Sequence, residues 1–339
     1  MKKILIALGI IIALLLVGYW SGPKFPAPEL STDLPKIGVQ TSTFESYLKQ
    51  KEAGLKLKPD NESRVIWAND SLKEKTPYCL LYLHGFSASW FEGEPIHRDF
   101  ARRFGMNLYI PLLASHGIDT TEALIDMTPD RLWKSAKEAL VAAHSLGEKV
   151  ILMSTSTGGT LSLKLAAEFP DLMDGVILLS PNIAINDPAA FLVSKPWGLQ
   201  LARFVKKGNY REAKADHPEE LQYWQCKQRL EAAVYLQQLV ESTMTEKTFK
   251  KVTKPVFLGY YYKDEKNQDG VVRVDAMLKM FDQLSTPENL KQKVAFTEAG
   301  THVIGCKLLS GAWQDVENAA FTFAEEKLGL KPLTEKLKD

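Results

Sequence analysis

Residues 150–160 read VILMSTSTGGT, and the fold of the chain follows from them. Four apolar residues precede a run of small ones, and the next stretch, LSLKLAAEF, carries a mostly helical stripe of apolar side chains. An apolar run that stops at small residues and continues into such a stripe predicts a strand, a sharp turn and a helix. Ser156 lies on the predicted turn, with Ser154 two residues before it and Gly158 two residues after it.

A serine at such a turn is typical of a nucleophile elbow, in which a strained backbone lifts the hydroxyl out of the sheet. Small residues are then required two positions before and after the serine, and the usual pattern is Gly-x-Ser-x-Gly. Ser154 departs from this pattern, and its hydroxymethyl group crowds the turn without blocking it. The alternative is a polar turn without chemistry, because serine, threonine and glycine also cluster in ordinary loops.

The amino terminus contains seventeen uncharged residues, Ile4 to Trp20. This run exceeds the usual core of a signal peptide and just reaches the length that spans a bilayer. Tyr19 and Trp20 occupy positions where a cleavage site needs small side chains, and no cysteine directly follows for lipidation. We expect an uncleaved membrane anchor, with a cleaved signal peptide as the alternative. Lys2 and Lys3 favour a cytoplasmic amino terminus and a periplasmic or cell-surface location for the rest.

Residues 21–40 contain four prolines, which predicts an extended tether that holds the globular part away from the membrane. The remaining chain is long enough to bury a large core as one domain. A net charge of +1 gives no argument for a nucleic-acid partner.

The sequence has three widely spaced cysteines, Cys79, Cys226 and Cys306, so at most one disulfide forms. Buried thiols are favoured, and the spacing is not that of a metal site.

From Arg64 onward, predicted strands and helices alternate, which indicates a mostly parallel sheet covered on both faces. Reactive groups in such a sheet lie at the carboxyl ends of the strands. LYLHGFSAS, residues 81–89, follows one of these strands. Acyl transfer needs two backbone N–H donors for its oxyanion, one after the nucleophile and one from a loop after an earlier strand. Thr157 and Phe86 occupy these two places, and His84 is expected to tie the loop down.

An acidic residue that orients a histidine is expected in the loop between the strand near Tyr262 and the next helix. Asp264, Glu265 and Asp269 compete for this role. Asp269 is preferred, because the apolar turn that follows it would bury and fix the carboxylate. Asp264 is the reserve candidate, and a solvated loop charge or a helix cap is the alternative for either residue.

His302 lies in a Gly-Thr-His loop, and it is the one histidine placed after the last predicted strand. A general base needs one ring nitrogen held by a carboxylate and the other facing the serine. His97, His144 and His217 fall on predicted helices or their surface turns, where we expect exposed side chains. His116, in the ASHG loop, is expected to be structural and near the mouth of the site.

The order Ser156, Asp269, His302, each after a predicted strand, resembles the α/β-hydrolase family from about Arg64 to the last helix. More narrowly, HGFSAS, ASHG, STSTGG and AGTHVIG resemble the bacterial carboxylesterase and monoacylglycerol-lipase branch. The resemblance implies a nucleophile, an acid and a base in that order, with oxyanion-hole amides on Phe86 and Thr157. We expect an α/β-hydrolase domain over 41–330, followed by a basic tail at 331–339.

In that fold, residues 186–252 are the expected helical cap, inserted between strands 6 and 7. Its predicted helices carry the aromatic residues Trp197, Phe204, Tyr223, Trp224 and Tyr235, most of which we expect to pack against the main domain. The expected reaction is hydrolysis of a small-molecule carboxylic ester, such as a monoacylglycerol or another lipid-like ester, through an acyl-enzyme on Ser156, and it needs no cofactor or metal. The alternatives are an amide or peptide hydrolase of the same fold and an inactive binding protein.

Overall fold

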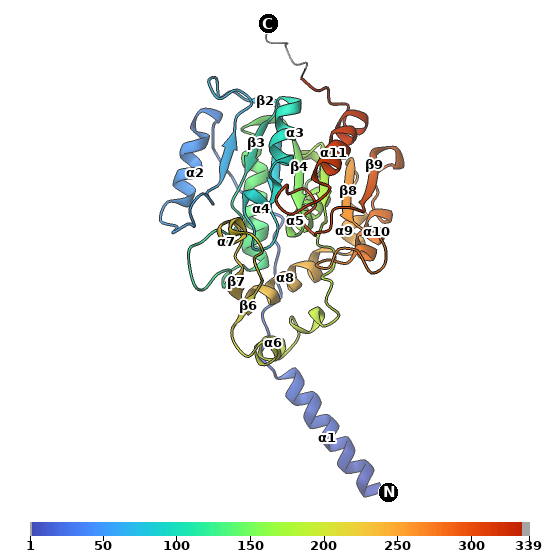
Figure 1. The fold of residues 1–339 in the computed structure, drawn as a ribbon. Coiled ribbons are helices and arrows are strands. Elements are labelled where there is room, and N and C mark those ends of the chain that lie inside the picture. Colours follow the sequence, from blue (N-terminus) through green and yellow to red (C-terminus); the bar gives the residue numbers. More distant parts are fainter. Residues whose placement is uncertain (1, 334–339) are drawn as a thin grey trace.

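The computed structural model describes residues 2–333 (Figure 1). Within them, a seven-stranded sheet has the order β1-β3-β2-β4-β5-β8-β9. Neighbouring strands are parallel except for β1, which pairs antiparallel with β3. The strands are β1 (Arg64–Ile66), β2 (Thr76–Leu83), β3 (Asn107–Ile110), β4 (Gly147–Thr155), β5 (Gly175–Leu179), β8 (Val256–Tyr261) and β9 (Lys291–Phe296). The mostly parallel sheet expected from the sequence is thereby confirmed.

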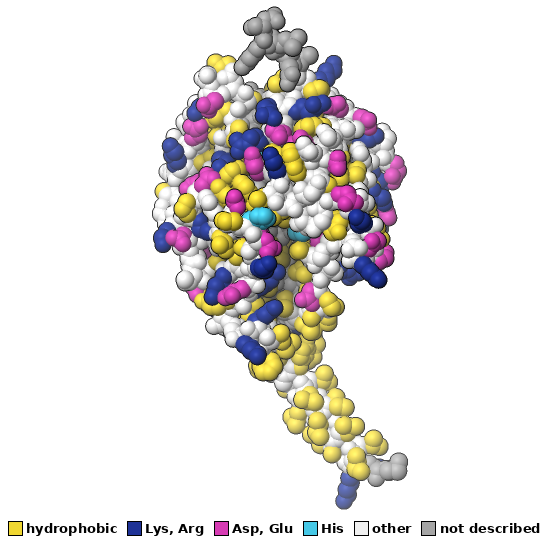
Figure 2. All heavy atoms as spheres, in the orientation of Figure 1, with side chains coloured by type: hydrophobic (Ala, Val, Ile, Leu, Met, Phe, Trp, Pro, Cys, Tyr) yellow, Lys and Arg dark blue, Asp and Glu magenta, His cyan; other side chains and the backbone are white. Residues whose placement is uncertain are grey.

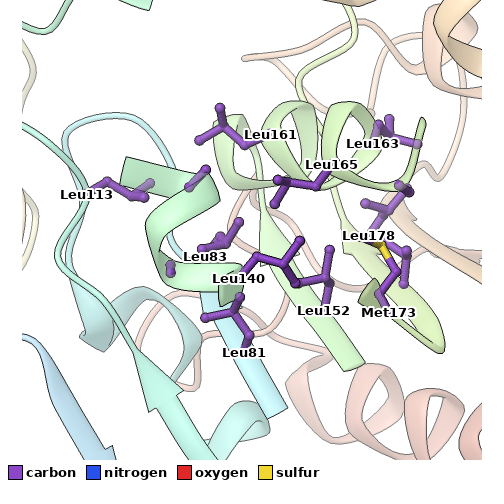
Figure 3. Packing of buried hydrophobic residues seen from close by; sticks show 14 of the residues in the cluster. Leu81, Leu83, Leu113, Leu140, Leu152, Leu161, Leu163, Leu165, Met173 and Leu178 are labelled. Atoms are coloured by element: carbon purple, nitrogen blue, oxygen red, sulfur yellow. The ribbon is translucent and has the colours of Figure 1, made fainter. Parts of the chain in front are cut away.

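Helices cover both faces of this sheet. Helices α4 (Pro129–Ala143), α5 (Thr157–Glu168) and α10 (Val274–Asp282) contribute to one buried cluster, together with Leu81, Leu152 and Leu178 of three neighbouring strands (Figure 3). Helices α3 (Ile96–Phe104) and α11 (Trp313–Lys327) join a second cluster that contains Leu80 and Ile151. Adjacent strand residues thus enter opposite clusters, as the pleat of a strand requires, and strands buried on both faces read as nearly continuous apolar runs.

The start of α4 follows its local sequence signals. Thr128 is the N-cap, and its side chain accepts a hydrogen bond from the backbone N–H of Arg131 at 3.3 Å. Pro129 occupies the first helical position, where its missing N–H costs nothing because that group would have no intrahelical partner. Thr128 followed by Pro129 is a helix-start signal that the sequence alone provides.

The insertion between β5 and β8 contains α6 (Gly198–Lys206), β6 (Tyr210–Glu212), α7 (Pro218–Tyr223), β7 (Lys227–Arg229), α8 (Leu230–Thr243) and α9 (Glu246–Phe249). Two features differ from the expected helical cap between strands 6 and 7. The insertion also holds the antiparallel pair β6–β7, whose three-residue strands are too short to show periodicity in the sequence. Counted along the chain, it joins the fifth and sixth of the seven strands of this sheet in the described residues.

Three of the five aromatic side chains singled out on the cap pack against other aromatic rings. Tyr223 stacks on Phe91 with 4.4 Å between ring centroids, and Tyr235 meets Phe25 edge-on at 5.1 Å. Trp224 also lies beside Phe91, at 6.3 Å. The remaining two, Trp197 and Phe204, belong to the exposed large hydrophobic residues.

Helix α1 (Lys2–Trp20) projects away from the domain with an almost entirely hydrophobic surface (Figure 2). Its most apolar stretch of 18 residues has a mean hydropathy of 2.4, and none of the side chains of the helix is buried. By length and composition this is the one helix of the described residues that could cross a membrane, and a signal sequence passes the same test.

Residues 21–40 contain no helix or strand, and several of them lie against the domain. Asp130 accepts hydrogen bonds from the backbone N–H groups of Glu29 and Leu30. The carbonyl of Ser31 accepts from Trp133 Nε1 at 2.7 Å. These partners lie about a hundred residues away in sequence, so proline content alone could not reveal the contact.

The three cysteines are free, with Cys79 and Cys306 buried and Cys226 half-buried, in agreement with the expected thiols. Residues 334–339 of the expected basic tail lie outside the described residues.

A second helix near the amino terminus, α2 (Phe44–Glu52), packs through Phe44 and Leu48 against the buried cluster that contains Leu81 and Leu152.

Candidate active site

Ser156 lies between the end of β4 and the start of α5 in a conformation that few serines adopt. Its φ of 53° and ψ of −117° are outside the regions that side chains with a Cβ normally occupy, at a cost on the order of 1–3 kcal/mol. The backbone holds it there: its N–H donates to Leu179 O at 3.1 Å, and its carbonyl accepts from Asn182 N at 2.9 Å. The strained turn expected from the sequence is therefore present.

The small residues around Ser156 have different tolerances. A Cβ on Gly158 would lie 1.9 Å from Leu83 O, so any larger residue would collide with the backbone of β2. Ser154, in contrast, is a buried residue of β4 with an ordinary φ. Its side chain fits without the clash that excludes one at Gly158, which explains how the chain departs from Gly-x-Ser-x-Gly at this position only.

Asp269 and His302 form a buried pair. His302 Nδ1 donates to Asp269 Oδ2 at 2.6 Å, while Asp269 Oδ1 accepts from the backbone N–H groups of Val271 and Val272 at 2.8 and 3.0 Å. Burial raises the pKa of Asp269, but the neighbouring histidine and these hydrogen bonds outweigh it and leave the pKa below its ordinary value. Burial likewise opposes charging of His302, yet Asp269 leaves the pKa of the imidazole raised.

The other candidate acids lie elsewhere in the same loop. Asp264 is exposed, and its carboxylate accepts from the backbone N–H groups of Lys266 and Asn267, both at 2.9 Å. Glu265 is exposed and accepts from the hydroxyl of Tyr262 at 3.0 Å. Geometry therefore pairs Asp269, and neither alternative, with the histidine.

His302 Nε2 is buried and has no hydrogen-bond partner among residues 2–333. The structure thus holds the histidine by one nitrogen and leaves the other unpaired, without a hydrogen bond to Ser156. Such bonds are often long in free enzymes and shorten only when substrate is bound. An unpaired ring nitrogen in a buried position is available to accept a proton.

The loop after β2 presents free backbone donors. In the described part of the chain, the N–H groups of Phe86 and Thr157 donate to no protein acceptor. His84 fastens this loop: Leu113 N–H donates to His84 Nε2 at 3.1 Å, so the other ring nitrogen carries the proton and donates to Gly85 O at 2.9 Å. Burial keeps this imidazole neutral by lowering its pKa to about 3.

The remaining histidines differ from one another. His116 lies beside His84 with 4.9 Å between ring centroids, and its Nδ1 bonds the carbonyl of Ala114, which fits a structural role. His217 is exposed, and His144 is half-buried at the end of α4. The expectation of an exposed side chain is wrong for His97, which is fully buried and bonds Trp90 O at 2.9 Å. It lies on the face of α3 that packs on the sheet, a face that helical periodicity alone leaves ambiguous.

Sequence reasoning did not single out Glu92, which the fold places at the centre of the site. It lies in the short helix η2 (Trp90–Gly93) and is only 2% exposed. Its Oε2 accepts from Gly85 N–H at 2.6 Å, and a methyl group on Gly85 would lie 2.7 Å from Glu92 Oε1 and 3.0 Å from Ser156 Cβ. The one signal in the sequence is a charged residue inside the apolar stretch Trp90–Gly93.

Burial raises the pKa of Glu92 to about 7, although the Gly85 amide and His302 both favour the charged form. Its charge in turn raises the pKa of His302. Glu92 is thus electrostatically coupled to the histidine and positions the backbone that precedes Phe86.

The cap contacts the loops on both sides of the site. Gln225 N–H donates to Ser87 O at 2.7 Å, next to the Phe86 amide. At the start of the insertion, Asn186 N–H donates to Val271 O at 2.9 Å, beside the carboxylate of Asp269. A movement of the cap would therefore displace the backbone of both loops.

Residues 2–333 contain no cluster of three or more His, Cys, Asp or Glu side chains that could hold a metal ion.

Comparison with known proteins identifies the fold. A family model, Hydrolase_4, described as serine aminopeptidase S33, matches residues 133–296. This range contains Ser156 and Asp269 and ends before His302. No curated protein sequence matches the chain.

Solved structures show the same architecture. A structure from work on the metagenome-derived lipolytic enzymes LipS and LipT has a TM-score of 0.64 at 16% identity, over 79% of this chain and 98% of its own. Monoacylglycerol lipase from Paleococcus ferrophilus has a TM-score of 0.54 at 14% identity, over 77% and 96% of the two chains. A soluble variant of monoglyceride lipase from Saccharomyces cerevisiae has a TM-score of 0.56 at 11% identity, over 78% and 91%.

The sheet order and these likenesses define the class of protein: this is an α/β-hydrolase fold. The partial family match and these structural likenesses agree with the esterase and monoacylglycerol-lipase-like branch of this fold. The resemblance expected from the sequence motifs is confirmed.

Glu92 predicts a pH dependence of stability. The pKa of Glu92 is about 7 in the folded protein, against an ordinary value of 4.5. The stability that protonated Glu92 contributes to the folded state is therefore complete below about pH 4.5 and is lost as the pH rises through 7. By linkage this loss is roughly 3 kcal/mol of unfolding free energy. Denaturant unfolding of wild type and Glu92→Gln between pH 5 and 8 should show wild type losing stability relative to the variant.

The matched control is Glu74→Gln, because Glu74 is exposed and its carboxylate pairs with no described residue. Its stability should follow that of wild type at every pH. Parallel curves for wild type and Glu92→Gln would contradict the raised pKa of the buried carboxyl.

Proposed function

We propose that the protein is a serine hydrolase that cleaves carboxylic esters through an acyl-enzyme on Ser156. The observation that carries this proposal is the buried Asp269–His302 pair, which leaves His302 Nε2 unpaired. Ser156 is held at a strained turn, and Gly85 lies close both to the Cβ of Ser156 and to the carboxylate of Glu92. The charge of Glu92 in turn raises the pKa of His302. A nucleophile, a base and an orienting carboxylate are the parts that acyl transfer needs.

In this mechanism Ser156 Oγ attacks the ester carbonyl while His302 Nε2 takes the hydroxyl proton. Asp269 holds the imidazole in the tautomer that carries its proton on Nδ1, and it stabilises the imidazolium that forms. His302 then returns the proton to the leaving alcohol. Water, activated by the same nitrogen, hydrolyses the acyl-enzyme and regenerates Ser156.

The oxyanion of each tetrahedral intermediate is assigned to the backbone N–H groups of Phe86 and Thr157. Both groups lack acceptors in the described residues, so binding an oxyanion would break no existing hydrogen bond. Donors held in place before the reaction are effective because they need no reorganisation as charge develops. Glu92 and His84 hold the loop that carries the first donor.

A lipid-like ester, such as a monoacylglycerol, is the proposed substrate class. Support comes from the two neighbours named as monoacylglycerol or monoglyceride lipases and from the apolar helix α1, which would hold the enzyme beside membrane esters. The family description as a serine aminopeptidase favours a second candidate, hydrolysis of an amino-terminal peptide bond, because the same triad serves amides.

Helix α1 is proposed to anchor the protein with its catalytic domain outside the cytoplasm. At 1.5 Å per residue its apolar run spans roughly 25 Å, so its aromatic and basic flanks would anchor the ends in a core of about 30 Å. Lys2 precedes the run and Trp20 ends it, an arrangement that suits an interface at each end.

The test of the reaction is a profile of the purified protein against p-nitrophenyl esters of graded chain length, beside an aminopeptidase substrate and a monoacylglycerol. Ester hydrolysis that exceeds peptide hydrolysis supports the proposal. Hydrolysis of the peptide substrate alone would favour the aminopeptidase. Failure to hydrolyse any substrate or to react with a fluorophosphonate probe would point to an inactive binding protein.

Ser156→Ala should abolish ester hydrolysis and fluorophosphonate labelling while the fold stays intact, because the variant removes only the attacking oxygen. Ser154→Ala is the matched control, since Ser154 is a neighbouring serine of β4 and should keep most activity. Circular dichroism and rate measurements on both variants check this prediction. Activity lost in the second variant and kept in the first would overturn the assignment of the nucleophile.

Asp269→Asn should lower turnover by on the order of 10⁴, because it removes the charge that fixes the tautomer and stabilises the imidazolium. Asp264→Asn is the matched control from the same loop and should be much milder, since Asp264 bonds only its own turn. Steady-state kinetics on one ester gives both values. The reverse ranking would move the acid to Asp264.

The anchor is tested by fractionating cells that express the full-length protein, followed by mass spectrometry of its amino terminus. An intact terminus in the membrane fraction is expected. A soluble form that begins near residue 20 would show that the segment is a cleaved signal peptide.

A further inference from the structure

Helix α6 of the cap has apolar side chains on two faces. Its inner face packs through Leu199 and Ala202 against the cluster that contains Leu230 and Val234 of α8. Its outer face is exposed, although a helix at a protein surface ordinarily turns polar residues outward. Scattered exposed apolar side chains are normal, but a cluster on one helix face usually marks a contact surface.

The outer face consists of Trp197, Leu201, Phe204 and Val205. Their exposed fractions are 46%, 47%, 83% and 64%. The spacing of four, three and one residues places all four side chains on one side of the helix. We call this set the α6 outer face.

The α6 outer face adjoins the end of α1. Trp197 Nε1 donates to Gly18 O at 2.9 Å, and its backbone N–H donates to Pro23 O at 3.0 Å. The indole packs so closely on Gly22 that a Cβ there would lie 2.1 Å from Nε1. Figure 1 shows α6 at the end of the cap from which α1 departs, and Figure 2 shows hydrophobic side chains at this junction.

The charges around this face suit a lipid surface. Lys24, Lys206 and Lys207 are exposed, and none of them forms an ion pair with a described residue. Arg203, which points toward the cap, is neutralised by Glu231. An apolar helix face bordered by free lysines, with a tryptophan at its edge, is the pattern of a helix that lies in a membrane interface with anionic headgroups.

We propose that the α6 outer face inserts into the interface of the bilayer that α1 crosses. The cap then rests on the membrane, and α1 and α6 together fix the orientation of the domain. This inference rests on the proposed insertion of α1. It goes beyond anchoring, since a protein anchored by α1 alone would leave Phe204 and Val205 in water.

The test uses full-length protein with Cys226→Ser, in which the two remaining cysteines are buried. A single added cysteine carries an environment-sensitive NBD fluorophore, in vesicles of phosphatidylcholine and phosphatidylglycerol with or without nitroxide-labelled lipid. The three positions are Phe204→Cys on the α6 outer face, Leu8→Cys within α1 and Leu221→Cys. Leu221 is the matched control, because it is a 60% exposed cap residue on α7.

Blue-shifted emission and nitroxide quenching are expected at Phe204→Cys and Leu8→Cys, and neither is expected at Leu221→Cys. Quenching at Leu8→Cys alone would overturn the inference and leave the anchor intact. Absence of quenching at Leu8→Cys would remove the anchor and the inference with it. A concentration-dependent blue shift at Phe204→Cys without nitroxide quenching would show that a second copy of the chain covers this face, and it would also overturn the inference.

Discussion

The structure depends on the backbone conformation of a single residue, Ser156. The turn brings α5 back across the sheet so tightly that Gly158 passes against the carbonyl of Leu83. Hydrogen bonds from Asn182 N–H and to Leu179 O hold the strained residue from the neighbouring strand. Strain of this kind persists only where the surroundings leave no alternative. The long apolar strands on both sides of β4 supply rigid surroundings. The packing of the core therefore holds Ser156 in the conformation that exposes its hydroxyl.

A second constraint is electrostatic. Three ionisable groups, Asp269, His302 and Glu92, are buried close to one another, and each alone would be costly to charge in such surroundings. Asp269 is compensated by two backbone amides and the imidazole, so it stays charged. Glu92 has a single strong donor, the Gly85 amide, and its pKa therefore rises toward neutrality. The unequal supply of hydrogen bonds gives two carboxyls of one site different protonation near neutral pH.

Local patterns in the sequence were enough to predict the sheet, the entry of α4 and the strained turn, because each depends on residues within a few positions. They also favoured Asp269 over Asp264, since the apolar turn after it supplies the amides that fix its carboxylate. Glu92, the burial of His97 and the docking of residues 21–40 were missed. The first and third depend on partners that are distant in the chain, and the second depends on which face of a helix meets the sheet. Such dependences produce no periodic pattern in the sequence.

The docking of residues 21–40 has a mechanical consequence. A flexible chain of that length has a root-mean-square end-to-end distance of roughly 25 Å, so the domain would move by about this distance around its point of attachment. Here Asp130 and Trp133 clamp the segment to α4, and Gln238 Nε2 bonds Pro26 O at 2.9 Å. In a membrane-inserted chain these contacts would replace a flexible linker by a fixed connection between α1 and the domain. Encounters with membrane-borne molecules would then be governed by lateral diffusion in the plane of the bilayer, at a fixed height and with one side of the enzyme always presented.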